Sequence, residues 1–173
     1  MTEVITDTGP ILHLNEINNL LVLDIFEQIK LPDLVADELE AYDLNVNKLN
    51  IKTNIVICPI DHEQSLNIRQ KLGQPFIHLT DAAVFILAQN ANFSLPVLTD
   101  DLALRRQLEM HDTLVTGSIG ILIRAYHQQL INKTELESAI DSLFNDSSLQ
   151  LSQVFRVYVH KLLNELNKKN TLF

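Results

Sequence analysis

The sequence predicts an α/β protein in which helices cover both faces of one parallel sheet. Short β-favouring runs alternate with helical patterns over the first two thirds of the chain, and only helical patterns follow. Parallel strands need long crossovers, which are usually helical. Alternation of this kind therefore places helices on both sides of the sheet, with further helices at the C-terminal end.

The first part of the chain contains two expected strands, each followed by helical structure. Val4–Thr6 is β-favouring and ends at the turn residues Asp-Thr-Gly-Pro. Pro10 suits the first turn of a helix, and a break in the helical spacing near Asn18-Asn19 predicts two helices. A second strand over Ile29–Leu31 should stop at the following proline, with Asp33 as N-cap of the next helix.

The alternation continues to about residue 118. Strands are expected over Ile55–Ile60, Leu95–Thr99 and Thr113–Val115, each bounded by polar or turn residues. Thr80 can cap a helix whose apolar faces are nearly continuous, so this helix should be buried on most sides. The expected helices after residue 30 are, in order, 33–42, 61–73, 81–90, 101–110, 118–129, 133–144 and 151–168.

Length and composition predict one globular domain. The chain has 173 residues, 46% of them apolar, with only 4 Gly and 5 Pro, which excludes a disordered or collagen-like chain. No repeat, low-complexity segment or domain boundary is visible. We expect a single domain over residues 1–173, with a helical C-terminal extension over about 130–173.

The sequence also predicts a cytoplasmic protein without a membrane segment. The longest apolar runs, such as Ala82–Ala88, fall far short of the roughly 20 residues that a membrane span needs. No basic stretch precedes an apolar run at the N-terminus, so no secretory signal is expected. Cys58 is the single cysteine and has no internal disulfide partner, which favours a reducing compartment.

Acidic residues are concentrated in the first part of the chain. The net charge is −9, which argues against a protein that coats nucleic acid through clustered Lys and Arg. Residues 1–101 hold 15 Asp and Glu against 5 Lys and Arg. A solvated acidic surface explains this excess, and so do carboxylates gathered at a cation site. Composition alone favours the solvated surface.

Five of these carboxylates fall where a parallel α/β sheet would bring them together. Asp7 ends the first strand, Asp100 and Asp101 end the strand over 95–99, and Asp81 lies in the first turn of the buried helix. Glu38 lies near the middle of the helix after the second strand. Sites in open α/β sheets form beyond the carboxyl ends of strands, so these side chains are candidates for one site.

Each carboxylate has an alternative, structural explanation. Asp7 and Asp101 could be helix caps, Asp81 a favourable charge at a helix N-terminus, and Glu38 a solvated helix residue. Taken together, several carboxylates at one edge repel each other, and a divalent cation removes that cost. Oxygen ligands without a Cys/His cluster favour Mg²⁺ or Mn²⁺ over zinc.

The motifs in their order resemble the PIN-domain family, in a bacterial and archaeal branch similar to toxin–antitoxin ribonucleases. The similarity covers nearly the whole chain. The segments that carry it are Val4–Leu14, Leu31–Leu39, Thr80–Ala88, Val97–Asp101 with Arg105-Arg106, and Thr116–Leu122. The third segment departs from the branch, because Asp81 stands alone before Ala82 and Ala83 where glutamates are common.

The resemblance implies a fold, an activity and roles for particular residues. The implied fold is a three-layer α/β/α sandwich with a central parallel sheet of about five strands, and the implied activity is metal-dependent RNA cleavage. Asp7 would be a catalytic metal ligand shared between metals if two are bound. The other residues with implied roles are Glu38, Asp81 and Asp101 as catalytic metal ligands, Asp100 as the adjacent candidate ligand, and Thr8, Thr99, Arg105 and Arg106 around the substrate. The Thr-X-Asp pattern prefers Asp101 over Asp100.

These observations lead to the hypothesis of a Mg²⁺- or Mn²⁺-dependent endoribonuclease, and the resemblance suggests the toxin of a toxin–antitoxin pair. Its expected partners are RNA, a small antitoxin protein and a second copy of the chain, for which the apolar helices at residues 10–29 offer a surface. The main alternative is a non-catalytic PIN-like module that binds RNA or protein. A phosphatase of the haloacid-dehalogenase type is disfavoured, because Gly9 stands where it would need a second Asp.

Overall fold

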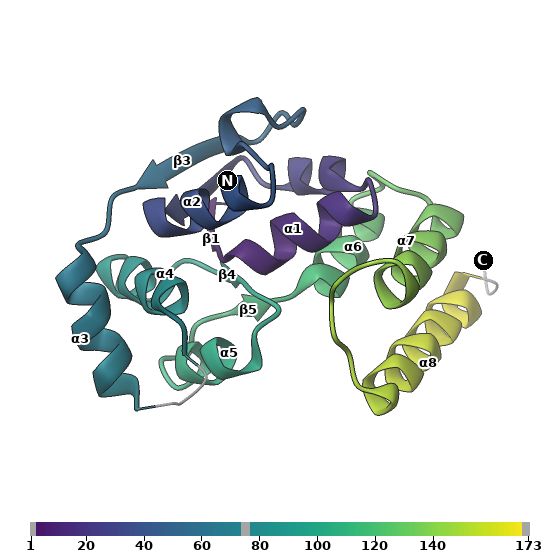
Figure 1. Ribbon diagram of the computed structural model, residues 1–173. Coiled ribbons are helices and arrows are strands. Elements are labelled where there is room, and N and C mark those ends of the chain that lie inside the picture. Colours follow the sequence, from purple (N-terminus) through teal and green to yellow (C-terminus); the bar gives the residue numbers. More distant parts are fainter. Residues whose placement is uncertain (1–2, 74–76, 171–173) are drawn as a thin grey trace.

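Five parallel strands form one sheet in the order β3-β2-β1-β4-β5, with helices flanking it (Figure 1). The computed structural model describes residues 3–73 and 77–170. The strands are β1 Glu3–Thr6, β2 Gln28–Pro32, β3 Asn54–Cys58, β4 Val97–Leu98 and β5 Val115–Thr116. The prediction of a three-layer α/β/α fold with a parallel sheet and a helical C-terminal region is confirmed.

Helices occupy most of the predicted segments. The α-helices are α1 Thr8–Glu16, α2 Asp33–Ala41, α3 His62–Leu72, α4 Leu79–Asn90, α5 Leu102–Glu109, α6 Ser118–His127, α7 Lys133–Asn145 and α8 Gln153–Asn170. Two further segments are 3-10 helices, η1 Leu20–Ile25 and η2 Val46–Lys48. The second helix expected after the Asn18-Asn19 break is therefore η1. Asn18 has a positive φ of 55°, which ends α1.

Two helix starts differ from the predictions. The N-cap of α2 is Pro32 rather than Asp33, and the Asp33 carboxylate accepts hydrogen bonds from the backbone N–H groups of Leu34 and Ile60. Helix α4 starts after His78 rather than after Thr80, because the Asp81 carboxylate accepts from the His78 N–H and closes the first turn earlier. Asp33 is thus the first residue of α2 and not its cap, whereas Asp81 lies in the first turn of α4, as the sequence predicted.

The chain reverses its direction of travel across the sheet at β1. From β1 the chain moves to β2 and β3 on one side, and β4 and β5 then fill the other side. The backbone N–H of Asp7 donates to the carbonyl of Leu98 at 2.9 Å, so the ends of β1 and β4 lie side by side. Such a reversal leaves a crevice beyond the carboxyl ends of the two strands, where α/β proteins bind ligands.

Helix α4 is the buried helix that the sequence predicted. It packs against β1 and β2, and every residue from Asp81 to Ala88 is buried. The C-terminal helices α7 and α8 lie beside each other at one end of the molecule, with the Phe144 ring against His160 and under Arg156 (Figure 1). None of the described helices has the length and apolar character to cross a membrane.

Ile86 offers a test of the α4 packing, since its side chain is completely buried. We expect Ile86→Ala to lower the free energy of unfolding by about 2–5 kcal/mol, because the substitution removes buried methyl groups and leaves a cavity. Leu66→Ala on α3 is the control, since Leu66 is 45% exposed, and should cost less than about 1 kcal/mol. Urea denaturation measures both values, and equal losses would contradict the packing described for α4.

Candidate metal centre

Two hydrogen bonds hold the Asp7 carboxylate at the sheet edge. It caps α1, with Oδ1 accepting from the Thr8 N–H at 2.7 Å and Oδ2 accepting from the Thr99 hydroxyl at 3.0 Å. Burial, and then the negative charges of Asp81 and Glu38, raise the pKa of Asp7 to about 7, against the two hydrogen bonds that lower it. Ionisation of Asp7 is therefore costly at this site.

Glu38 reaches this site from the middle of α2. Its Oε2 accepts a hydrogen bond of 2.5 Å from the hydroxyl of Thr8, which is the first residue of α1. The Thr8 backbone thus binds Asp7 while its side chain binds Glu38. Two carboxylates that are far apart in the sequence are joined by one small hydroxyl residue.

Asp81 approaches from the N-terminus of α4. Its side chain is buried, and Oδ2 accepts from the His78 N–H at 2.6 Å. Burial raises the pKa of Asp81 to about 7, and the charges of Asp101 and Glu38 add to the shift. The mutual repulsion of Asp7, Asp81, Glu38 and Asp101 places all four within one electrostatic cluster.

Asp100 and Asp101, which the sequence alone could not distinguish with certainty as ligands, have different partners in the structure. Asp101 caps α5 by accepting a hydrogen bond from the Leu104 N–H at 2.7 Å. Its negative charge contributes to the raised pKa of Asp81. Asp100 instead binds His13 Nδ1 at 2.8 Å and accepts from the N–H and hydroxyl of Ser118 at 2.7 and 2.5 Å. The partners of Asp100 therefore differ completely from those of Asp101.

Gly117 makes the Asp100 contacts possible. A Cβ atom at this position would lie 2.5 Å from Asp100 Oδ1 and 3.4 Å from the Thr99 carbonyl oxygen. Only glycine lets the turn before α6 approach the carboxylate so closely. Sequence reasoning did not identify His13 and Ser118 as partners of Asp100; His13 lies within α1, and Ser118 is the first residue of α6.

Thr99 connects the acidic cluster to the neighbouring part of the molecule. Its hydroxyl donates to Asp7 and accepts from the Asp101 N–H at 3.0 Å, which joins β1 to the start of α5. Its carbonyl oxygen accepts from the Arg105 guanidinium at 3.2 Å. The Thr99 side chain, which the resemblance placed around the substrate, thus contacts Asp7 and the start of α5.

The two arginines predicted to hold phosphates differ in their surroundings. Arg105 also donates to the carbonyl of Val115 at 3.2 Å and lies 3.8 Å from the carboxylate of Glu109. Arg106 is exposed and forms no ion pair with any residue that the structure describes. Arg105 therefore ties α5 to β5, and Arg106 is the arginine free to meet a ligand.

The donor set suits a hard divalent cation. Four carboxylates and no thiolate meet at this edge, and their repulsion is the cost that a cation would remove. Glu38, Asp81 and Asp101 each keep one oxygen without a hydrogen bond to the described residues. Within residues 3–73 and 77–170, no three Asp, Glu, His or Cys side chains already converge on one point, so binding requires side-chain movement.

Comparison with known proteins gives one match. A family model described as a PIN domain matches residues 3–165, which include every residue of the acidic cluster. No curated protein and no solved structure matches the chain.

The raised pKa values of Asp7 and Asp81 predict that the cation-free protein loses stability as the pH rises. Both pKa values are about 7 in the folded protein, above the ordinary value of 3.8, so folding favours the protonated acids. This contribution is complete below about pH 4 and is lost as the pH rises through about 7. In chelator, we expect the free energy of unfolding to fall over this range, and Asp7→Asn to weaken the fall.

Denaturation in urea at a series of pH values measures this effect. Asp43→Asn is the matched control, because Asp43 is exposed and its positive φ of 61° suits asparagine. An identical pH dependence in the wild type, Asp43→Asn and Asp7→Asn proteins would contradict the proposed crowding of charges.

Proposed function

Because the chain belongs to the PIN-domain family, whose members are in general nucleases, we propose that it is a metal-dependent endoribonuclease that hydrolyses RNA phosphodiester bonds. The observation that carries the proposal is the cluster of Asp7, Glu38, Asp81 and Asp101 at the reversal point of the sheet. Helix capping alone would not require two buried acids, Asp7 and Asp81, to repel each other and to have pKa values raised to about 7.

The four carboxylates of the cluster are the proposed ligands of Mg²⁺ or Mn²⁺. Such a cation, when bound, supplies Lewis acidity that favours ionisation of water and offsets negative charge on the phosphate. The oxygen-only donor set supports this choice of metal over zinc. Asp7 is the proposed central ligand, since it interacts electrostatically with both Asp81 and Glu38.

The surrounding residues keep these carboxylates in place. The hydroxyls of Thr99 and Thr8 orient Asp7 and Glu38 through hydrogen bonds of 3.0 and 2.5 Å. Asp7, Asp81 and Asp101 lie at the N-termini of α1, α4 and α5, whose positive dipole ends offset part of the crowded charge. The same dipole ends favour an approaching phosphate.

Substrate and protein partners extend the proposal. Arg106 is exposed one turn after Asp101 and is the proposed contact for a phosphate that flanks the cleaved bond. A small antitoxin protein would neutralise the activity if the chain is a toxin, and a second copy of the chain is a further proposed partner. Leu21 on η1 is 60% exposed and could contribute to either interface.

A non-catalytic PIN-like module that binds RNA or protein is the second candidate function. One observation favours it: the described carboxylates hold hydrogen bonds to the protein and do not converge on one point. RNA cleavage and metal binding separate the two candidates, because the module would bind without turnover.

Asp7→Asn tests the nuclease directly. We expect metal-dependent cleavage of total cellular RNA to fall at least about 100-fold, because the central carboxylate charge is lost. The variant should remain folded, since asparagine is also a good N-cap. Sequencing of new RNA ends, with Mg²⁺ or Mn²⁺ and with chelator, measures cleavage. Equal cleavage by the variant would refute the assignment.

Asp101→Asn and Asp100→Asn form a matched pair of neighbouring substitutions. We expect Asp101→Asn to abolish cleavage and to leave stability nearly unchanged, because the cap of α5 is retained. Asp100→Asn should keep cleavage but lower the free energy of unfolding by about 1–3 kcal/mol, because the charged partner of His13 and Ser118 is lost. The opposite pattern in the cleavage and denaturation assays would reverse the roles of the two residues.

A further inference from the structure

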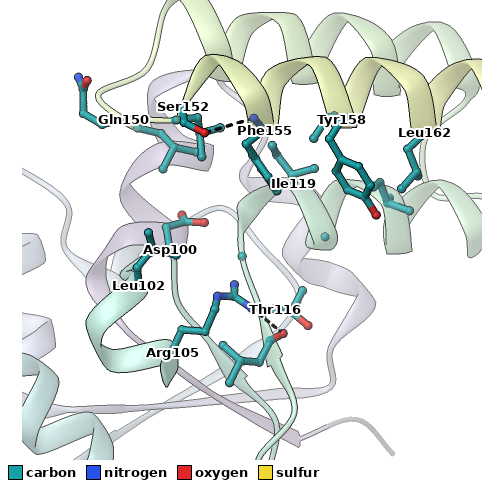
Figure 2. A pocket seen from close by; sticks show the side chains of 17 residues that line it. Asp100, Leu102, Arg105, Thr116, Ile119, Gln150, Ser152, Phe155, Tyr158 and Leu162 are labelled. Atoms are coloured by element: carbon teal, nitrogen blue, oxygen red, sulfur yellow. Dashed lines mark hydrogen bonds between the residues drawn. The ribbon is translucent and has the colours of Figure 1, made fainter. Parts of the chain in front are cut away.

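A cavity of about 600 Å³ lies between α6 and the C-terminal helix α8 (Figure 2). Its walls are mainly apolar, with Ile119 and Ile123 on α6 and Leu162 on α8. The aromatic rings of Phe155 and Tyr158 extend from α8 towards α6 and are 40% and 56% exposed. Val159 on α8 also lines the cavity and is buried, and Leu163 on the same helix is buried as well.

The cavity and the acidic cluster share the end of β4. Asp100 and Arg105 line the cavity, and Asp101, the next residue after Asp100, belongs to the cluster. Thr99 contacts both places, since its hydroxyl binds Asp7 and its carbonyl oxygen binds Arg105. The cavity therefore adjoins the cluster along the segment that follows β4.

The lining has the chemistry of a nucleobase pocket. Unpaired RNA bases are recognised by stacking on aromatic rings within apolar walls, with a few polar groups to meet the base edge. Here the rings are Phe155 and Tyr158, whose centroids lie 6.1 Å apart. The polar groups are the Tyr158 hydroxyl and the guanidinium N–H groups of Arg105 that its bonds to Thr99 and Val115 leave unused. The cavity volume exceeds that of a single base, so one base enters without opening the helices.

The distribution of charge also favours a nucleic acid at this place. The acidic excess of the chain lies in residues 1–101, whereas residues 102–173 hold 8 Lys and Arg against 7 Asp and Glu. All cavity-lining residues except Asp100 come from the second part. The lining itself carries no net charge, since Arg105 balances Asp100, so a polyanion meets less repulsion here than at the four carboxylates of the cluster.

We propose that the cavity between α6 and α8 binds the base of an unpaired nucleotide adjacent to the phosphate cleaved at the acidic cluster. This inference rests on the proposed nuclease function and adds a specificity site to it. The stacking platform is Tyr158, supported by Phe155, and a base bound there selects single-stranded RNA, since a paired base cannot leave its helix without cost.

Binding and photo-cross-linking test the pocket without turnover. The Asp7→Asn protein is mixed in Mg²⁺ with single-stranded RNA of mixed sequence that contains 4-thiouridine, and the cross-linked peptides are identified by mass spectrometry. We expect cross-links at Phe155 or Tyr158, and about 5- to 150-fold weaker RNA binding when Tyr158→Ala is added. Cross-links confined to other residues would overturn the proposal.

Three further variants exclude indirect effects. Tyr158→Phe keeps the ring and should bind RNA nearly as the parent protein does. Ile123→Trp fills the cavity and should weaken binding while α8 stays intact. Tyr42→Ala is the matched control, because Tyr42 is 55% exposed and lies outside the cavity, and its loss should leave binding unchanged. Equal weakening by Tyr42→Ala would contradict a specific pocket.

Parallel cleavage assays keep the base pocket and the nuclease proposal distinguishable. If the wild type cleaves RNA and Tyr158→Ala binds and cleaves RNA equally well, the proposed base pocket is refuted and the nuclease proposal stands. Cross-links at the pocket without any cleavage support the pocket as an RNA-binding site and refute the nuclease. If Tyr158→Ala keeps RNA binding but abolishes self-association in gel filtration, the cavity is a protein interface and the proposal fails.

Discussion

The parallel pairing of β1 with β4 is the constraint on which the site depends. These strands are separated by most of the α/β region in the sequence, yet the Asp7 N–H donates to the Leu98 carbonyl at 2.9 Å. The chain turns to opposite sides of the sheet from this pair, which opens a crevice beyond the carboxyl ends of the two strands. The crevice is a consequence of topology, and its acidic character comes from residues that follow the two strands.

Crowding of carboxylates in that crevice is opposed by backbone dipoles and hydroxyl groups. Helices α1, α4 and α5 direct their N-termini at Asp7, Asp81 and Asp101, and each carboxylate accepts a backbone hydrogen bond. The raised pKa values of Asp7 and Asp81 mean that these contacts do not cancel the cost of burial and repulsion. A bound cation would offset this remaining cost of burying and crowding the carboxylates, so the cluster is suited to bind one.

A second layer of contacts extends from the cluster towards the C-terminal helices. Thr99 connects Asp7 to Arg105, and Asp100 fixes the start of α6 through Ser118. Gly117 permits that approach, and α6 then forms one wall of the cavity under α8. The same short segment after β4 thus positions the Asp101 carboxylate of the cluster on one side and a wall of the cavity on the other.

The sequence alone determined the order of strands and helices, the burial of α4 and the positions of the acidic residues after strand ends, because periodicity and turn chemistry are local properties. The short lengths of β4 and β5, the starts of α2 and α4, and the different partners of Asp100 and Asp101 were decided by tertiary contacts. Adjacent residues in an extended segment point to opposite sides, and only the packed neighbours decide which side meets the cluster. The cavity under α8 has the same origin, since its walls come from segments that no local pattern relates.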